Sequence, residues 1–118
     1  MLGEQIPIRS IPVELLAGDA SKTVYTVGTI DPQSGTKEQV VVTGIHVFSV
    51  TAAAQIVTLQ DATPGVTALK IPASWAAGSQ IDFNNMGGIE MTRGQNLIIK
   101  PAAAGPAQFW IVDFYVRS

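Results

Sequence analysis

The chain has 118 residues and no cysteine, which excludes disulfide bonds, thiolate metal sites and cysteine nucleophiles. Only 14% of its residues are charged and 47% are hydrophobic, whereas typical soluble domains are about 25% charged. The seven lysines and arginines are scattered and the net charge is −2, so we expect no nucleic-acid partner. Few charges and abundant apolar residues indicate an outer surface that is partly buried in an assembly.

The amino-terminal residues 1–5 have neither a basic stretch nor an apolar run, which argues against a cleaved signal peptide. No uncharged apolar run approaches the roughly 18 residues of a membrane helix. We therefore expect no membrane partner, and a protein that stays soluble in its cell or leaves within a particle.

Residues 6–16 are predicted to be extended, because Pro7 and Pro12 remove amide donors and disfavour a helix. The segment is dense in aliphatic residues, so it should be packed against something. It is either the first strand at the domain's own edge or an arm that reaches across a neighbouring subunit. We divide the chain into an extended arm, residues 1–18, and a single β-sandwich domain, residues 19–118. The candidate contact residues of the arm are Ile6, Ile8, Ile11, Val13 and Leu15.

The rest of the chain consists of short runs of β-branched and aromatic residues between Gly- and Pro-containing turns. Gly44 predicts a bulge or bend in the longest run, and residues 92–94 predict a tight hairpin. No convincing helix is present, so we predict an all-β fold, an antiparallel β-sandwich or jelly roll of about eight strands. The predicted strands cover residues 22–27, 38–50, 55–60, 67–71, 80–83, 89–91, 95–100 and 108–116.

The closing run is apolar on both faces when it is read with a strand's period of two. A strand of this kind is covered on both sides, and in a short chain the second cover can be another copy of the chain. One face carries Trp110, Val112, Phe114 and Val116. The other carries Phe109, Ile111 and Tyr115, which are candidate subunit contacts, and is interrupted by Asp113. The predicted core comprises Phe48, Leu59, Leu97, Ile99, Trp110, Val112 and Phe114.

Residues that could support chemistry are few. His46 is the only histidine and cannot build an imidazole metal site alone, so we predict a packed or interface residue. The acidic residues have no spacing typical of a calcium loop or a catalytic pair, and we assign turn capping and solvation to them: Asp61, Asp82, Glu90 and Asp113. Trp75, in a loop between Pro72 and Gly78, is the better ligand candidate of the two tryptophans, although a loop plug or subunit contact is favoured. We expect no enzyme activity, cofactor or metal.

Several segments together carry a family resemblance: the Pro-interrupted apolar arm, the long valine-rich run, and residues 81–84, 87–89, 96–99 and 109–115. Over roughly residues 22–116 the chain resembles the small β-sandwich structural proteins of tailed bacteriophage virions, particularly capsid decoration or cement proteins. The resemblance implies a non-enzymatic virion protein, assembled in the host cytoplasm and often a homotrimer. It would bind the major capsid protein and stabilise the shell. The arm and closing-strand candidates would then contact a subunit or the capsid. The alternative is a trimeric receptor- or carbohydrate-binding head domain of a phage tail fibre, with Trp75 as the ligand contact.

Overall fold

The computed structural model describes residues 9–29, 38–52, 55–62, 65–72, 74–84, 87–103 and 107–117. Every regular element in these ranges is a β-strand, which confirms the all-β prediction. The nine strands are β1 (Arg9–Leu15), β2 (Lys22–Tyr25), β3 (Gln39–Ser49), β4 (Val57–Asp61), β5 (Thr67–Ile71), β6 (Gln80–Phe83), β7 (Ile89–Glu90), β8 (Leu97–Pro101) and β9 (Gln108–Arg117).

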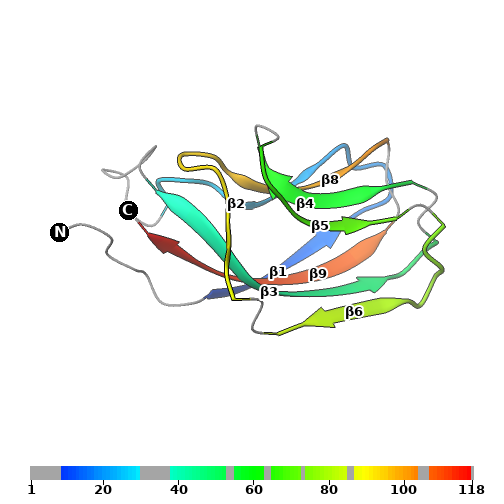
Figure 1. Cartoon of the computed structure of the whole chain (residues 1–118). Helices are drawn as coiled ribbons and strands as arrows, with labels where there is room; N and C mark the ends of the chain where they lie inside the picture. The colour runs from blue at the N-terminus through cyan, green and yellow to red at the C-terminus, as the bar shows by residue number, and fades with distance from the viewer. Residues whose placement is uncertain are drawn as a thin grey trace.

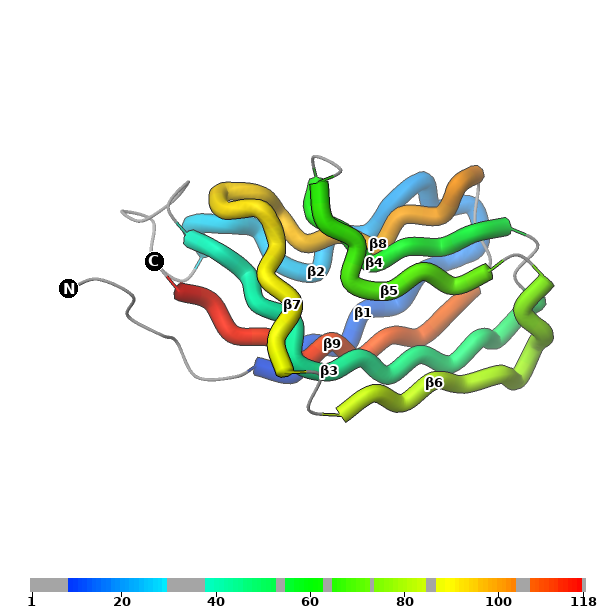
Figure 2. Tube along the Cα trace, viewed as in Figure 1, coloured from blue at the N-terminus to red at the C-terminus, as the bar shows by residue number. Residues whose placement is uncertain are grey.

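The strands form two antiparallel sheets that pack face to face (Figure 1). The five-stranded sheet has the order β1-β9-β3-β6, with β7 also paired to β3. The four-stranded sheet has the order β2-β8-β4-β5. After β7 the chain passes from one layer to the other, as Figure 2 shows. The predicted hairpin at residues 92–94 is therefore wrong, because β7 and β8 belong to different sheets.

The core lies between the sheets and is dominated by β9, which pairs with β1 on one side and β3 on the other. Its inward residues Trp110, Val112, Phe114 and Val116 are buried, and the Phe114 ring lies 5.4 Å from that of Tyr25. Leu59, Leu97 and Ile99 are buried from the opposite sheet, as predicted.

Phe48 is the exception to the predicted core, because 44% of it is exposed. A bulge between Val42 and Gly44, where the sequence predicts one, shifts the alternation of β3. Val42 points into the core before the bulge, whereas Ile45 and Val47 do so after it, so Phe48 points outward. A Cβ atom on Gly44 would lie 2.6 Å from Asp113 Oδ2 and 3.1 Å from the Phe83 carbonyl oxygen, so a larger residue would have to displace the Asp113 carboxylate.

The described part of the predicted arm is an integral strand. β1 pairs with β9 along its whole length, which favours the first of the two alternatives for residues 9–15. Val13 and Leu15 are buried in the chain's own core, and Ile11 packs against that core, so Val13 and Leu15 are not available as subunit or capsid contacts. Ile6 and Ile8 lie outside the described residues.

Candidate functional site on the outer face of the five-stranded sheet

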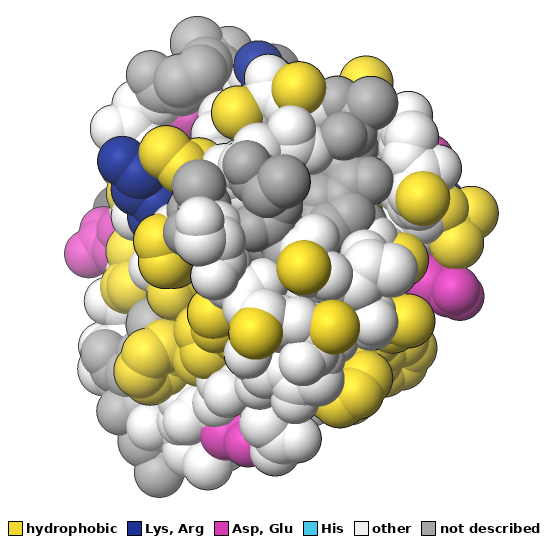
Figure 3. Space-filling view, turned by 90° about the vertical axis from the view of Figure 1, so that its right-hand side faces the viewer, with side chains coloured by type: hydrophobic (Ala, Val, Ile, Leu, Met, Phe, Trp, Pro, Cys, Tyr) yellow, Lys and Arg dark blue, Asp and Glu magenta, His cyan; other side chains and the backbone are white. Residues whose placement is uncertain are grey.

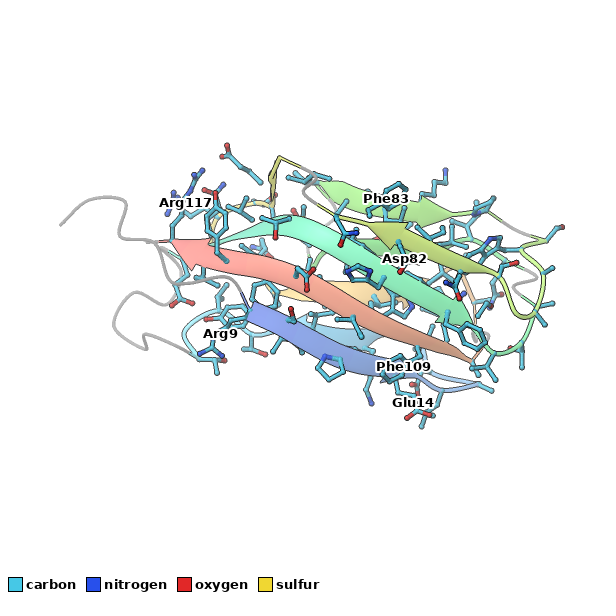
Figure 4. All side chains as sticks on the ribbon, turned by 90° about the horizontal axis from the view of Figure 1, so that it is seen from below. Arg9, Glu14, Asp82, Phe83, Phe109 and Arg117 are labelled. Carbon is cyan, nitrogen blue, oxygen red and sulfur yellow. The ribbon has the colours of Figure 1, made fainter. Side chains whose placement is uncertain are left out.

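Side chains that alternate with the core residues form the outer face of the five-stranded sheet, seen from below in Figure 4. A line of hydrogen-bonded polar side chains crosses four strands of this face. Ser10 Oγ on β1 donates to Asp113 Oδ1 on β9 at 2.6 Å. Asp113 Oδ2 lies 3.3 Å from His46 Nε2 on β3, and His46 Nδ1 lies 2.9 Å from Asp82 Oδ1 on β6.

Each ring nitrogen of His46 faces a carboxylate oxygen, and the protonated ring can donate to both carboxylates at once. The hydrogen bond to Asp82 is the largest cause that raises the pKa of His46 above its ordinary value. Partial burial lowers the pKa, but the contact with Asp113 raises it further. The imidazole therefore links β3, β6 and β9 through its contacts with the two carboxylates, and these contacts favour its protonated form.

This arrangement supports binding or structure rather than catalysis. Both ring nitrogens of His46 are engaged by carboxylate oxygens, so neither is free to face a substrate or a metal ion. The two carboxylates lie on opposite ring nitrogens and do not converge on one point. No group of three or more acidic, histidine or cysteine side chains in the described ranges could hold a metal.

The predicted turn capping holds for Asp61, and the predicted solvation agrees with the exposed side chains of Asp82 and Glu90, but the sequence did not predict the partners of these residues. Asp61 caps a turn, accepting hydrogen bonds from the backbone of Gly65 and Val66. Asp82 and Asp113 instead bracket His46, and Glu90 pairs with Arg117. Spacing along the chain gives no signal for these pairs, because they depend on strand register after the Gly44 bulge.

The His46 bridge makes stability depend on pH. Because the folded-state pKa is raised, the bridge contributes fully below the unfolded value of about 6.5 and its contribution is lost as pH rises through the folded value. We expect His46→Gln to lower the free energy of unfolding more at about pH 6 than at about pH 9. Urea unfolding of both proteins at the two pH values measures this, and an equal loss at both would show that the bridge is not charged.

A shallow hollow of about 140 Å³ adjoins the polar line. It is small beside ligand pockets of about 300–1,000 Å³, so it suits a single side chain rather than a small-molecule substrate. Phe48 and Phe109 are cross-strand partners beside it, and 41% of Phe109 is exposed. The hollow is lined by His46, Val47, Phe48, Gln80, Asp82, Phe109 and Ile111.

Apolar side chains remain uncovered around this hollow and at the adjacent end of the sandwich. Phe109 is exposed, and Ile111 and Tyr115 are half-buried on the outer face, so the chain itself fully covers only the inner face of β9. Leu16 and Val50 are also exposed, where β1 and β3 end. Figure 3 views this end and shows hydrophobic side chains across it, with charged side chains toward the edges.

Trp75 does not form an exposed platform. It is half-buried and packs against the hydrophobic core, as expected of a loop plug. It lines neither the hollow beside Phe109 nor a second hollow, of about 220 Å³, on the outer face of the four-stranded sheet. Within the described residues no helix is long and apolar enough to cross a membrane.

Comparisons with known proteins identify the fold. No protein-family model matches the chain, and no curated protein matches it significantly. A chain of the acidic stable capsid structure of Helicobacter pylori bacteriophage KHP30 is similar in structure, with a TM-score of 0.59, 6% identity, and coverage of 98% of this chain and 93% of that one. A chain of the Bacillus endospore appendages, a novel family of disulfide-linked pili, has a TM-score of 0.50 at 10% identity, covering 100% of this chain and 91% of that one. At these identities the likeness shows a shared β-sandwich fold.

Proposed function

We propose that this chain is a structural protein of a bacteriophage virion, a capsid decoration or cement protein that binds the outer shell and stabilises it. The observation that carries the proposal is the outer face of β9. This strand is central in its sheet, yet it presents Phe109, Ile111 and Tyr115 away from the core. Uncovered aromatic and aliphatic side chains of this kind are typical of a surface that docks on another protein.

The chemistry of the face supports a non-enzymatic role. The one histidine is held between two carboxylates, and the adjoining hollow has room for a side chain. The capsid origin of the KHP30 chain, which shares the fold, is in keeping with a virion protein. The resemblance of the sequence to cement proteins supports the finer assignment, including a homotrimer and the major capsid protein as partner.

The tail-fibre alternative has less support. It needed Trp75 as an exposed ligand contact in a concave site, whereas the indole is packed against the core. Trp75 therefore gives no support to a receptor- or carbohydrate-binding head.

The test is binding to capsids that lack the protein. We expect the purified chain to add density to the outer surface of such capsids in cryo-electron microscopy and to raise the temperature at which they release their DNA. Phe109→Asp should reduce this occupancy by about tenfold or more, because it places a charge in the core of the contact. Phe83→Asp is the matched control, since Phe83 is 43% exposed but sits opposite Ile45, away from the outer face.

Absence of the protein from every particle, or full occupancy by Phe109→Asp, would contradict the proposal. Equal losses with the Phe83 and Phe109 variants would point to general destabilisation, and would count against this face as the contact.

A further inference from the structure

The two sheets carry opposite charge. The strands of the five-stranded sheet contain four carboxylates, two arginines and the histidine, whereas the strands of the four-stranded sheet contain three lysines and one carboxylate. The carboxylates of the first sheet are Glu14, Asp82, Glu90 and Asp113, and the lysines of the second are Lys22, Lys70 and Lys100.

The acidic side chains of the five-stranded sheet lie on its outer face. Glu14 is exposed and stands directly opposite Phe109, and Asp82 borders the hollow with 54% of its side chain exposed. Glu90 is neutralised by Arg117, and His46 offsets one of its two carboxylate partners. The end of the face around Phe109 is therefore both acidic and apolar, as the positions of Glu14, Asp82 and Phe109 in Figure 4 show.

The outer face of the four-stranded sheet is basic. Lys70 and Lys100 lie on either side of Thr58 in register and are both exposed. Asp61 does not lie on this face, because it is buried and stands opposite the core residue Leu97. The hollow on this face combines Lys100 with the exposed Ile56, so this face too presents apolar surface beside its charges.

We propose that copies of the chain associate face to back, with the outer face of the five-stranded sheet of one copy on the outer face of the four-stranded sheet of the next. Contact between two identical faces would bring like charges together, whereas the unlike faces attract. Apolar side chains beside the charges, Phe109 on one face and Ile56 on the other, contribute burial at the same contact. A contact between two different faces is heterologous, so a stack that does not close into a ring ends in one copy with a free five-stranded outer face and one copy with a free four-stranded outer face. The free end face that carries Phe109 is the one available to dock on a shell.

This inference deepens the proposed homo-oligomer by naming the two contacting surfaces, and it does not depend on the virion location. It also specifies the chemistry of the partner surface, which is a basic face with aliphatic neighbours. Opposite exposed charges are screened over about 10 Å at 0.1 M salt, so association should weaken as salt is added.

The test uses two charge reversals and their mixture. Glu14→Lys cancels the excess negative charge of the acidic face, because Asp82 and Asp113 remain there, and Lys100→Glu cancels the excess positive charge of the basic face, because Lys70 remains there. Neither side chain has a hydrogen bond or ion pair in the described structure. In sedimentation velocity at low salt, each variant alone should associate about tenfold more weakly than the wild type. An equimolar mixture should regain association, because the unaltered acidic face of the Lys100→Glu variant complements the unaltered basic face of the Glu14→Lys variant.

Arg9→Glu is the matched control. It changes the charge by the same amount as Lys100→Glu, but Arg9 pairs with the inward-facing Phe114 and so lies off both outer faces. It should leave association unchanged. A wild type that stays monomeric, a mixture no better than either variant alone, or an equal loss with Arg9→Glu would overturn the proposal. Because no capsid is present, none of these outcomes bears on binding to a virion.

Discussion

Replacing Trp110 with alanine should lower the free energy of unfolding by about 3–5 kcal/mol, a large share of a typical stability of about 5–15 kcal/mol. Trp110 is fully buried near the start of β9, where it is flanked by Val13 of β1 and Val47 of β3. Truncation removes the transfer energy of the indole and leaves a cavity that strands paired on both sides cannot close. Urea unfolding followed by circular dichroism measures the change.

The indole also satisfies a buried polar group. Its Nε1 donates to Gln108 Oε1 at 3.0 Å, and Gln108 Nε2 has no partner among the described residues. Truncation would therefore leave a buried amide with neither end bonded, which adds to the loss.

Phe109→Ala is the control for the tryptophan substitution. Phe109 is the next residue on the same strand but points outward and is exposed, so its truncation should cost the isolated chain less than about 1 kcal/mol. A similar loss for both substitutions would mean that the outer face is already covered within the chain, and would remove the basis for a docking surface.

Asp61→Ala should cost about 3 kcal/mol or more, because one buried carboxylate holds three separate backbone groups. Its oxygens accept from the N–H groups of Gly65 at 3.0 Å, Val66 at 3.2 Å and Thr92 at 3.0 Å. The first two close the turn before β5, and the third anchors the crossing from β7 to β8. Thermal unfolding of the variant measures the loss.

The charge of Asp61 also makes the stability of the fold depend on pH. Burial raises the pKa of Asp61, but hydrogen bonds from Thr92, Gly65 and Val66 outweigh it and the pKa is lowered overall. The carboxylate therefore stabilises the fold above its unfolded value of about 3.9, and this contribution is lost as pH falls through the lower folded value. Asp61→Asn keeps one acceptor oxygen and should lose less than Asp61→Ala. If neither Asp61→Ala nor Asp61→Asn changes the free energy of unfolding at about pH 7, the carboxylate does not hold the turn.

Local sequence patterns predicted most of the strands, because β-branched runs favour strands, and Gly or Pro residues favour turns, through interactions that extend over only a few residues. The closing strand shows this most clearly, since its period of two separates Trp110 from Phe109 as the structure does. Pattern alone could not place Phe48, because a one-residue bulge inverts the rest of the strand. It also could not show that residues 92–94 change sheets, which depends on Met91 entering the core and Thr92 binding Asp61.

The candidate site was the least predictable part. Its contacts join residues 36, 67 and 103 positions apart in the chain, so they follow from strand order and register rather than from spacing. The contact candidates of the closing strand could be predicted from the sequence, because the alternation of apolar side chains along one strand is visible in consecutive residues. The opposite charges of the two sheets became visible only when the strands were assigned to their layers.

The bulge at Gly44 adds one residue to β3 relative to its partner β9, and this extra residue decides which later side chains of β3 face the interior and which face the surface. Beyond the bulge, the remaining half of β3 assigns Ile45 and Val47 to the interior and His46 and Phe48 to the surface. Loss of a single residue at this point would exchange these two sets, burying the His46 imidazole and the Phe48 ring while exposing two aliphatic side chains. Insertions and deletions here are therefore far more damaging than substitutions elsewhere on the face. Variation in the chain's binding partners should accordingly arise by exchanging outward side chains, with the length of this strand held constant.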